Sequence, residues 1–421
     1  MRAVRSAGVA GAMTASVLVG VSGAPAAASS HLQPEQILYD FDGPNGAGPL
    51  SGVSIGAGGT LYGTTTFGGK LGDGDVYKLT PSGAAYTETI LHTFGAKGDG
   101  SKPDGNVVVN SKGDLFGVTT VGGADQQGTA FELVPSGPRY VETVIHTFTG
   151  GEDGGQPIGT LQLNASGDLF GVTQFGGTTN GGVVFELSPT KNGYHEQVLH
   201  TFSYAAALPQ AGLTMARNGT LYGTGYGDGS VHTDGLVFRL RPNAKGYVYA
   251  DLYNFKGGAD GSNPFSALTM STSTGDIFGT TEYGGDAGGE GTVFELIPTG
   301  AGYSERVLHG FTSEQGELLQ APVLLQGDGD LFGTASGGGT GCKGGCGTVF
   351  ELIPTGSTYR FKSVYRFTGP PDGAEPQWGP LVSEANGDLL GTTRSGGTGS
   401  GCSDGGPGGV PGCGTLYQIE P

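Results

Sequence analysis

The chain has 421 residues, and its 87 Gly and 23 Pro make up about a quarter of them, against an average of about 12%. Glycine at this density excludes long helices, and because it does not fall at every third position it also excludes collagen. The formal net charge of −18 argues against nucleic acid, whose binding needs Lys and Arg to neutralise phosphates, and against anionic membrane surfaces. Hydrophobic residues still make up 36% of the chain, so the composition indicates a turn-rich all-β protein with a sizeable core.

The N-terminus is predicted to be a secretory signal peptide over residues 1–28. Arg2 and Arg5 precede an apolar stretch rich in Ala, Gly and Val, and the small residues 26–28 before Ser29 form a cleavage site of the Ala-x-Ala kind. The alternative, a membrane anchor, is disfavoured because the apolar stretch is short. No later segment has 18 consecutive apolar residues, so we expect residues 29–421 to form one domain without a membrane span.

A repeat with a period of 53 to 56 residues runs through this domain. Its first marker is a Phe that ends an x-[His/Tyr]-x-Phe stretch. The second is the Gly of [Leu/Ile]-[Phe/Tyr/Leu]-Gly, and the third is the aromatic residue of Gly-x-[Val/Ala/Leu]-[Phe/Tyr]. All three occur seven times, in phase. The first marker lies at Phe41, Phe94, Phe148, Phe202, Phe255, Phe311 and Phe367, the second at Gly63, Gly117, Gly171, Gly223, Gly279, Gly333 and Gly391, and the third at Tyr77, Phe131, Phe185, Phe238, Phe294, Phe350 and Tyr417.

Each unit is predicted to contain four short strands joined by turns. In the second unit the first strand lies at 106–110, the second is "LFGVTT" at 115–120, and the fourth is "ETVIHTF" at 142–148. The third strand is typified by "VFELIP" at 293–298. These runs are rich in β-branched and aromatic residues and end at Gly, Pro, Asn or Asp. Seven such units predict an all-β fold, a seven-bladed β-propeller of four-stranded blades.

The two ends of the domain are predicted to close the ring together. Residues 35–41, "EQILYDF", resemble a fourth strand with no other strand of its unit before it. Residues 414–420, "GTLYQIE", resemble a third strand with no fourth strand after it. We therefore expect the N-terminal strand to supply the outer strand of the last blade, which leaves no blade incomplete.

These motifs resemble a known repeat family. The "LYGTTxxGG…GxVFxLxP" core and the "F-x-G-x-x-DG-x-x-P" linker are similar to the Gloeobacter/Verrucomicrobia-type (GloVer) tandem repeat over essentially all of residues 35–421. The resemblance implies an exported bacterial protein, and it brings no catalytic residue to this chain. Many members carry a C-terminal anchor that this sequence lacks. We therefore expect a soluble monomer, secreted or periplasmic.

The loops that join strands 2 and 3 and strands 4 and 1 of the units, here called the 2–3 and 4–1 loops, lie on one face of such a ring. They are longer and more variable than the 1–2 turns, so this face is the expected place of a binding site. The 2–3 loops of units six and seven hold the four cysteines, and the repeat context favours the local pairs Cys342–Cys346 and Cys402–Cys413. Other pairings are open. Zinc fits poorly because the spacings do not match paired C-x₂-C motifs, so we expect disulfides and no metal.

Aromatic and acidic residues on the same face are the candidate ligand-binding residues. Exposed aromatic rings beside carboxylates suit stacking on sugar rings, although the rings could equally cap the apolar layer between blades. One histidine of this face lies in a loop with two acids, and a solvated loop is the alternative interpretation there. The candidates are Trp378, Tyr226, Tyr283, His232, Asp228 and Asp234.

Two further sets of residues recur with the repeat and are interpreted as structural. His92, His146, His200 and His309 share one position with three tyrosines, which indicates a flat amphipathic side chain on an outer strand rather than metal ligands. Asp-Gly pairs begin at Asp99, Asp153, Asp260 and Asp372 and favour turns. The alternative for the pairs is a ring of carboxylates at the channel mouth that holds Ca²⁺. Apart from this option, no cofactor is expected.

Two function classes remain. The first is an exported, non-catalytic binding or scaffold propeller, with a carbohydrate or another extracellular or envelope component as its ligand. The second is an enzyme acting on polysaccharide, a lyase or a glycoside hydrolase, with its site at the channel mouth. We favour binding over catalysis because no catalytic constellation stands out and propellers carry many functions.

Overall fold

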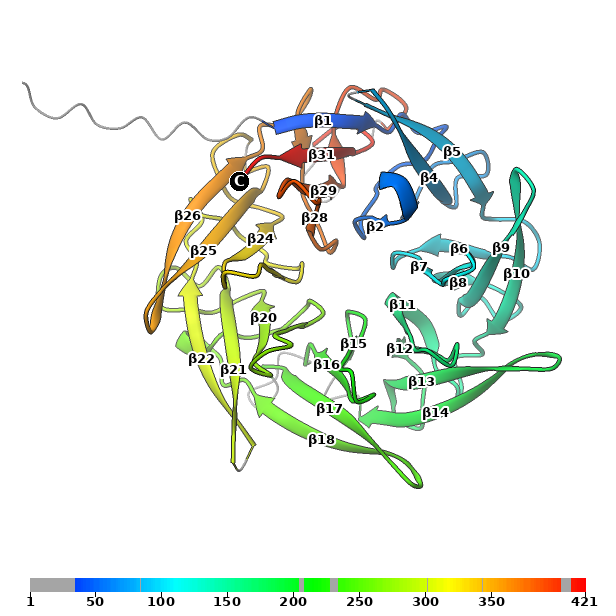
Figure 1. Ribbon diagram of the computed structural model, residues 1–421, viewed down its shortest axis with the longest axis horizontal. Coiled ribbons are helices and arrows are strands. Elements are labelled where there is room, and N and C mark those ends of the chain that lie inside the picture. Colours follow the sequence, from blue (N-terminus) through cyan, green and yellow to red (C-terminus); the bar gives the residue numbers. More distant parts are fainter. Residues whose placement is uncertain are drawn as a thin grey trace, which may run out of the picture. The chain divides into compact units, whose positions relative to one another are not determined.

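The structure, a computed structural model, describes residues 35–421 apart from 84, 204–207, 228–233, 301, 343 and 403–409. Seven antiparallel sheets stand around a central axis like the blades of a propeller (Figure 1). The predicted seven-bladed propeller is therefore confirmed. Two three-residue helices, η1 (Ala57–Gly59) and η2 (Gly258–Asp260), are the helices of the described residues, and neither could span a membrane.

The strands follow the predicted order within each blade, from the innermost to the outermost. Blade 1 contains β2 (Ser54–Ile55), β3 (Leu61–Thr65), β4 (Asp75–Ser82) and β5 (Ala85–Thr93); blade 2 contains β6 (Gly100–Pro103), β7 (Val108–Val109), β8 (Leu115–Gly122), β9 (Thr129–Ser136) and β10 (Arg139–Thr147); blade 3 contains β11 (Gly155–Leu163), β12 (Leu169–Phe175), β13 (Asn180–Thr190) and β14 (Gly193–Ser203).

The remaining blades repeat this pattern. Blade 4 contains β15 (Thr214–Met215), β16 (Leu221–Gly225), β17 (Leu236–Asn243) and β18 (Gly246–Asn254); blade 5 contains β19 (Thr269–Met270), β20 (Ile277–Thr281), β21 (Thr292–Thr299) and β22 (Gly302–Gly310); blade 6 contains β23 (Leu324–Leu325), β24 (Leu331–Ala335), β25 (Thr348–Thr355) and β26 (Thr358–Arg366); blade 7 contains β28 (Val382–Ser383), β29 (Leu389–Thr393), β31 (Thr415–Ile419) and β1 (Glu35–Asp40). A small extra ribbon joins β27 (Gly373–Ala374) to β30 (Ser395–Gly396).

The ring closes as predicted. Strand β1 pairs antiparallel with β31, from Glu35 opposite Ile419 to Asp40 opposite Thr415 (Figure 1). Blade 7 is therefore built from both ends of the domain. The pairing also buries Leu38 and covers the outer edge of β31, which would otherwise present unpaired backbone groups.

All three sequence markers belong to one contact between neighbouring blades. The marker Phe at the end of each outer strand is buried, and it packs on the marker aromatic ring of the following blade's third strand. The two ring centroids lie 4.8 to 5.1 Å apart at all seven seams. The marker Gly lies under the second ring, where a Cβ atom would come within 2.3 to 2.5 Å of it. The period of the sequence is therefore the period of this aromatic contact.

Candidate functional site

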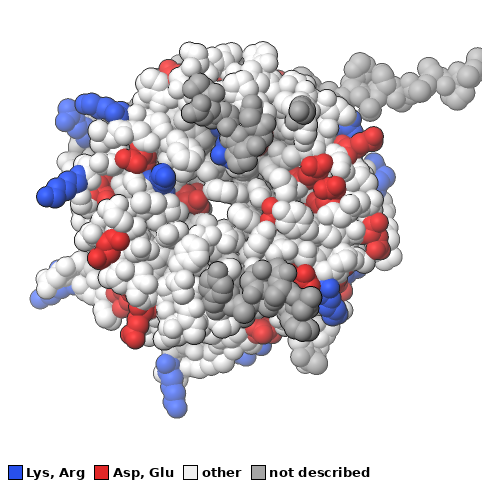
Figure 2. Space-filling view, turned by 180° about the vertical axis from the view of Figure 1, so that it is seen from behind, with Lys and Arg blue, Asp and Glu red and all other residues white. Residues whose placement is uncertain are grey.

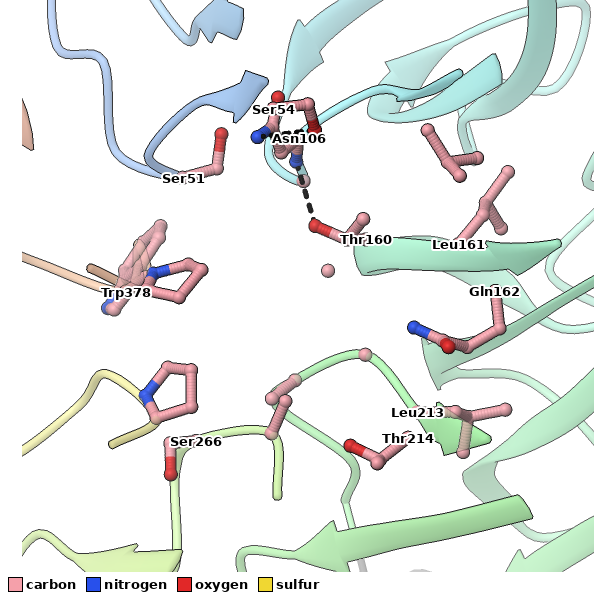
Figure 3. Close-up of a pocket in the computed structure, with 18 of the residues that line it drawn as sticks. Ser51, Ser54, Asn106, Thr160, Leu161, Gln162, Leu213, Thr214, Ser266 and Trp378 are labelled. Atoms are coloured by element: carbon pink, nitrogen blue, oxygen red, sulfur yellow. Dashed lines mark hydrogen bonds between the residues drawn. The ribbon is translucent and has the colours of Figure 1, made fainter. Parts of the chain in front are cut away.

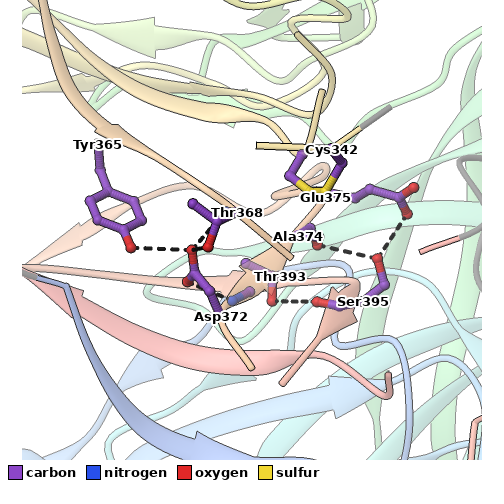
Figure 4. Close-up of a disulfide and its surroundings, with 10 residues drawn as sticks. Cys342, Tyr365, Thr368, Asp372, Ala374, Glu375, Thr393 and Ser395 are labelled. Atoms are coloured by element: carbon purple, nitrogen blue, oxygen red, sulfur yellow. Dashed lines mark hydrogen bonds between the residues drawn. A yellow bond between two sulfur atoms is a disulfide. The ribbon is translucent and has the colours of Figure 1, made fainter. Parts of the chain in front are cut away.

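Both predicted disulfides form in the structure. Cys342 pairs with Cys346 and Cys402 pairs with Cys413, and each pair has its Cα atoms 5.3 Å apart. The carbonyl of Cys346 accepts a hydrogen bond from the backbone N–H of Glu375 in the next 4–1 loop (2.8 Å). Figure 4 shows this neighbourhood, in which the Glu375 carboxylate also accepts the hydroxyl proton of Ser395 (3.1 Å). Each disulfide thus holds a 2–3 loop at the point where the following blade begins.

Peptide mapping without reduction is expected to yield Cys342 linked to Cys346 and Cys402 linked to Cys413. The two pairs lie in different blades, and each is already at bonding distance in the folded ring. The reduced and alkylated digest serves as the control. A peptide that links the loop of blade 6 to the loop of blade 7 would contradict the assignment.

A cavity of about 680 Å³ occupies the centre of the ring. All seven blades line it, through their innermost strands and the 4–1 loops that lead into them. Figure 2 views the ring from the side opposite to Figure 1 and shows a hollow at its centre. Because neighbouring entries to the innermost strands approach backbone to backbone at Gly105 and Gly159, part of the wall is formed by main chain rather than by side chains. The cavity is large enough for a small ligand or for part of a larger one.

Hydroxyl and amide groups dominate the polar part of the cavity wall. The hydroxyls of Ser54 and Thr214 donate to backbone carbonyls of the next blade, so they tie neighbouring blades together at the cavity wall. The Gln162 amide extends into the cavity from one side (Figure 3). Asp104 is the one ionisable side chain among the described residues of the wall. The wall therefore suits a mostly uncharged, polyhydroxylated ligand.

Trp378, the only Trp of the chain, is placed in this wall by a one-residue insertion. Leu381 follows Pro376 by five positions, whereas Val107 follows Pro103 by four in blade 2. Trp378 takes up the extra residue with a left-handed φ of 29°, a conformation unfavourable for a large side chain. Figure 3 shows its indole at the cavity, opposite the amide of Gln162. An insertion that places an aromatic ring here in only one of seven blades is not required by the repeat.

Phe265 of blade 5 extends the aromatic surface across the ring. Its ring stacks on that of Trp378, with centroids 5.8 Å apart and 25° between the planes. The Tyr226 ring packs edge-on against Phe265, also with centroids 5.8 Å apart. The three side chains come from three different blades, so they form a continuous aromatic path from the cavity to its mouth.

The mouth also contains a buried carboxylate with two donors. Glu282 accepts hydrogen bonds from the Tyr226 hydroxyl (2.7 Å) and from the Gln320 amide (3.0 Å). Burial is the largest cause that raises the pKa of Tyr226 well above its usual range, and the hydrogen bond to Glu282 adds to it. Tyr226 therefore stays protonated and acts as a hydrogen-bond donor rather than as a base.

The structure separates the predicted candidates into three groups. Trp378 and Tyr226 meet through Phe265, and Tyr283, which is 43% exposed, lies on the same rim beside Glu282. Asp234 does not line the cavity; its backbone carbonyl accepts the N–H of Asn263 at 2.7 Å. The predictions for His232 and Asp228 fall outside the described residues.

Sequence reasoning did not find Phe265, Glu282, Gln320 or Asp104. Glu282 takes the position after the second strand that holds Thr66 in blade 1, and Phe265 takes the position of Leu50. Both positions vary from unit to unit, so the repeat singled out neither residue.

The recurrent Asp-Gly pairs lie at the outer edge of the ring, so the alternative of a Ca²⁺-binding carboxylate ring at the channel mouth is wrong. Asp99 accepts a hydrogen bond from His92 on the outer strand of the preceding blade (3.0 Å), and Asp372 accepts one from Tyr365 (3.2 Å; Figure 4). The structural interpretation of the histidines agrees with these contacts.

Among the described residues, one group, His92, Asp99 and Glu142, has its potential metal-ligand atoms within 4.8 Å of one another.

Comparison with known proteins identifies the family. The model of the Gloeobacter/Verrucomicrobia repeat matches residues 24–233 and 207–403. The chain belongs to this repeat family. The search among curated proteins found no match.

Several solved structures are similar to the GloVer chain in fold. A putative 6-phosphogluconolactonase from Bacteroides uniformis has a TM-score of 0.55 at 14% identity, over 86% of this chain and 98% of the other. A second, from Bacteroides fragilis, has a TM-score of 0.51 at 15% identity, over 81% and 87%. The GH74 enzyme of Niastella koreensis has a TM-score of 0.52 at 15% identity, over 85% of this chain and 52% of its own. At these identities the similarity establishes the fold alone.

Proposed function

We propose that this GloVer protein is an exported carbohydrate-binding propeller whose site is the central channel, entered from the face of the 2–3 and 4–1 loops. The observation that carries the proposal is the inserted Trp378, stacked on Phe265 at the wall of a cavity whose remaining lining combines aliphatic side chains with hydroxyl and amide groups. Aromatic faces with a few fixed polar groups are typical of small-molecule sites. The apolar faces of sugar rings match the indole, and the hydroxyls match the polar wall.

Export is part of the proposal and rests on two independent features. The predicted signal peptide precedes the domain, and two disulfides suit an oxidising compartment such as the periplasm or the extracellular space. All seven blades of one chain line the channel, and we expect the protein to be a monomer.

Catalysis on polysaccharide, the second function class, receives less support from the same residues. The tyrosine and carboxylate at the mouth, Tyr226 and Glu282, already satisfy each other through a hydrogen bond. A tyrosine whose pKa is raised is a poor proton acceptor. We therefore assign these two side chains to holding the shape of the mouth.

The single Trp makes the proposal directly testable by intrinsic fluorescence. We expect members of an oligosaccharide panel to shift or quench the emission of Trp378, because ligand would contact its ring. By calorimetry, Trp378→Ala should weaken binding of the same oligosaccharide roughly 30-fold or more, as is usual for a central aromatic contact. Phe67→Ala removes an exposed aromatic side chain of the blade 1 loop that does not line the channel, and it should leave the affinity unchanged.

Two results would count against binding in the channel. The first is a panel in which no oligosaccharide changes the emission or gives heat. The second is a Trp378→Ala variant that binds as tightly as the unmodified protein. Chromatography of the incubated oligosaccharides completes the test, since the appearance of shortened or unsaturated products would favour the enzyme class instead.

A further inference from the structure

Asp104 is an acid that the repeat does not require. It follows the proline of the 4–1 loop in blade 2 and precedes Gly105. Six blades build the same turn with a neutral side chain, so the carboxylate is not needed for the turn itself. The equivalent residues are Leu50, Ile158, Gln210, Phe265, Gln320 and Gln377.

Asp104 lines the cavity without a counter-charge. No Lys, Arg or His belongs to the described wall, and none of the ion pairs of the described residues includes Asp104. Its carboxylate is stabilised by the backbone of Gly159, yet burial outweighs this contact and raises its pKa to about 6. A carboxylate that has lost part of its water and has no counter-charge is unfavourable in its charged form.

We infer that the carbohydrate bound in the channel carries a basic group, such as the free ammonium group of an amino sugar, and that Asp104 pairs with this group. The inference rests on the proposed function and specifies its ligand class. An ammonium group would supply the missing counter-charge through a charge-assisted hydrogen bond. A uronic acid would bring a second carboxylate to the same wall, and a neutral sugar would leave Asp104 without a counter-charge.

Other features of the molecule agree with a cationic ligand. The formal net charge of −18 attracts cations to the protein and repels anions. The aromatic pair of Trp378 and Phe265 lies in the same cavity as Asp104, so a sugar ring could stack while its amino group reaches the carboxylate. Cations are also favoured near aromatic faces.

The test compares three oligosaccharides of equal length by calorimetry at about pH 6.5, above the Asp104 pKa. They are oligomers of glucosamine, of N-acetylglucosamine and of galacturonic acid. We expect the glucosamine oligomer to bind roughly ten- to a hundredfold more tightly than its acetylated counterpart, and the galacturonate oligomer to bind most weakly. Asp104→Asn should abolish the preference for the free amine, whereas Asp125→Asn, an exposed acid in the 2–3 loop of the same blade, should retain it.

The outcomes separate this inference from the proposal on which it rests. Equal binding of the free and acetylated oligomers, or a preference that survives Asp104→Asn, overturns the role of Asp104 and leaves carbohydrate binding in place. Binding of none of the three overturns both. A melting temperature of Asp104→Asn that is no lower than that of the parent protein shows that the change acts on the ligand rather than by unfolding the protein.

Discussion

A protein that lacks β1 is expected to melt roughly 10 °C or more below the protein that keeps it, because this strand joins the two ends of the domain within one sheet. Its removal exposes the edge of β31 and takes Leu38 out of a core shared with Phe41, Tyr77 and Leu416. Loss of a single large buried side chain already costs about 2–5 kcal/mol. Differential scanning calorimetry of a chain beginning at Phe41 measures the effect.

A circular permutant provides the matched control. Glu35 of β1 lies opposite Ile419, so the C-terminus at Pro421 can be joined to Glu35 by a short turn, with the new N-terminus placed after Asp40. This permutant has the same strands as the native ring, and blade 7 becomes an ordinary hairpin-connected blade. It should recover most of the lost stability. An unchanged melting temperature in the chain without β1 would show that the ring does not depend on this closure.

Thermal stability is expected to be highest in mildly acidic solution and to fall by roughly 5 °C or more between about pH 5 and pH 9. The cause lies at the outer edge of the ring, where five seams bring a half-buried Glu towards an Asp or Asn of the neighbouring linker. One carboxylate oxygen of each Glu is buried without a hydrogen-bond partner among the described residues. These residues are Glu35, Glu88, Glu142, Glu196 and Glu305.

Burial is the largest cause of the raised pKa values at these seams, and neighbouring acids add to it. The pKa is raised to about 10 at Glu35, where Asp372 contributes, and to about 8 at Glu88. It is raised to about 7 at Glu196 and at Glu305. The folded protein therefore binds more protons than the unfolded chain above about pH 4.5. Stability contributed by these groups is complete below that pH and is lost as the pH rises through 7, 8 and 10.

Histidines limit the stability on the acid side. Burial lowers the pKa of His146, His200 and His309, so the folded protein resists their protonation. Their contribution is present above about pH 6.5 and is lost as the pH falls below it. The glutamates stabilise the fold most below about pH 4.5, and the histidines stabilise it most above about pH 6.5. The optimum therefore lies between these two pH values, in mildly acidic solution.

Glu88→Gln tests the seam directly by melting curves across this range. The amide keeps the size of the side chain and can still accept the hydroxyl proton of Tyr39, which Glu88 accepts at 3.0 Å. The variant should melt higher than the parent at pH 9 and depend less on pH. Glu152→Gln, an exposed acid in the linker after blade 2, should change neither property. A parent protein whose melting temperature rises steadily from pH 5 to pH 9 would refute the account.

The two seams without such a Glu show why this pattern was not recognised from the chain alone. Tyr249 and Phe361 take the Glu position there, and each ring stacks on the seam histidine, His200 or His309. Sequence inspection identified the recurrent histidines as structural. It did not pair them with an acid or a ring on the next outer strand, because that contact joins residues about fifty positions apart.

The cysteine pairs and Trp378 illustrate what local sequence could predict at the candidate site. Each disulfide joins residues of one loop, so spacing within the repeat was sufficient to assign it. Trp378 stood out as the only residue of its kind. Its partner Phe265 did not, because the chain contains 20 Phe and nothing in the primary structure brings blade 5 to blade 7.

The amino-acid sequence by itself determined the number of blades, the strands of each blade and the closure of the ring. The physical reason is that one contact recurs between every pair of neighbouring blades. In it the marker Phe packs on the marker aromatic ring of the next blade, and that ring covers the marker Gly, so the contact imposes its period on the chain. Only the tertiary structure decided which side chains meet in the channel. There, seven loops converge at the axis because the ring is curved. Residues that depart from the repeat are thereby brought to one cavity: Trp378 contacts Phe265, and Asp104 lies in the same wall.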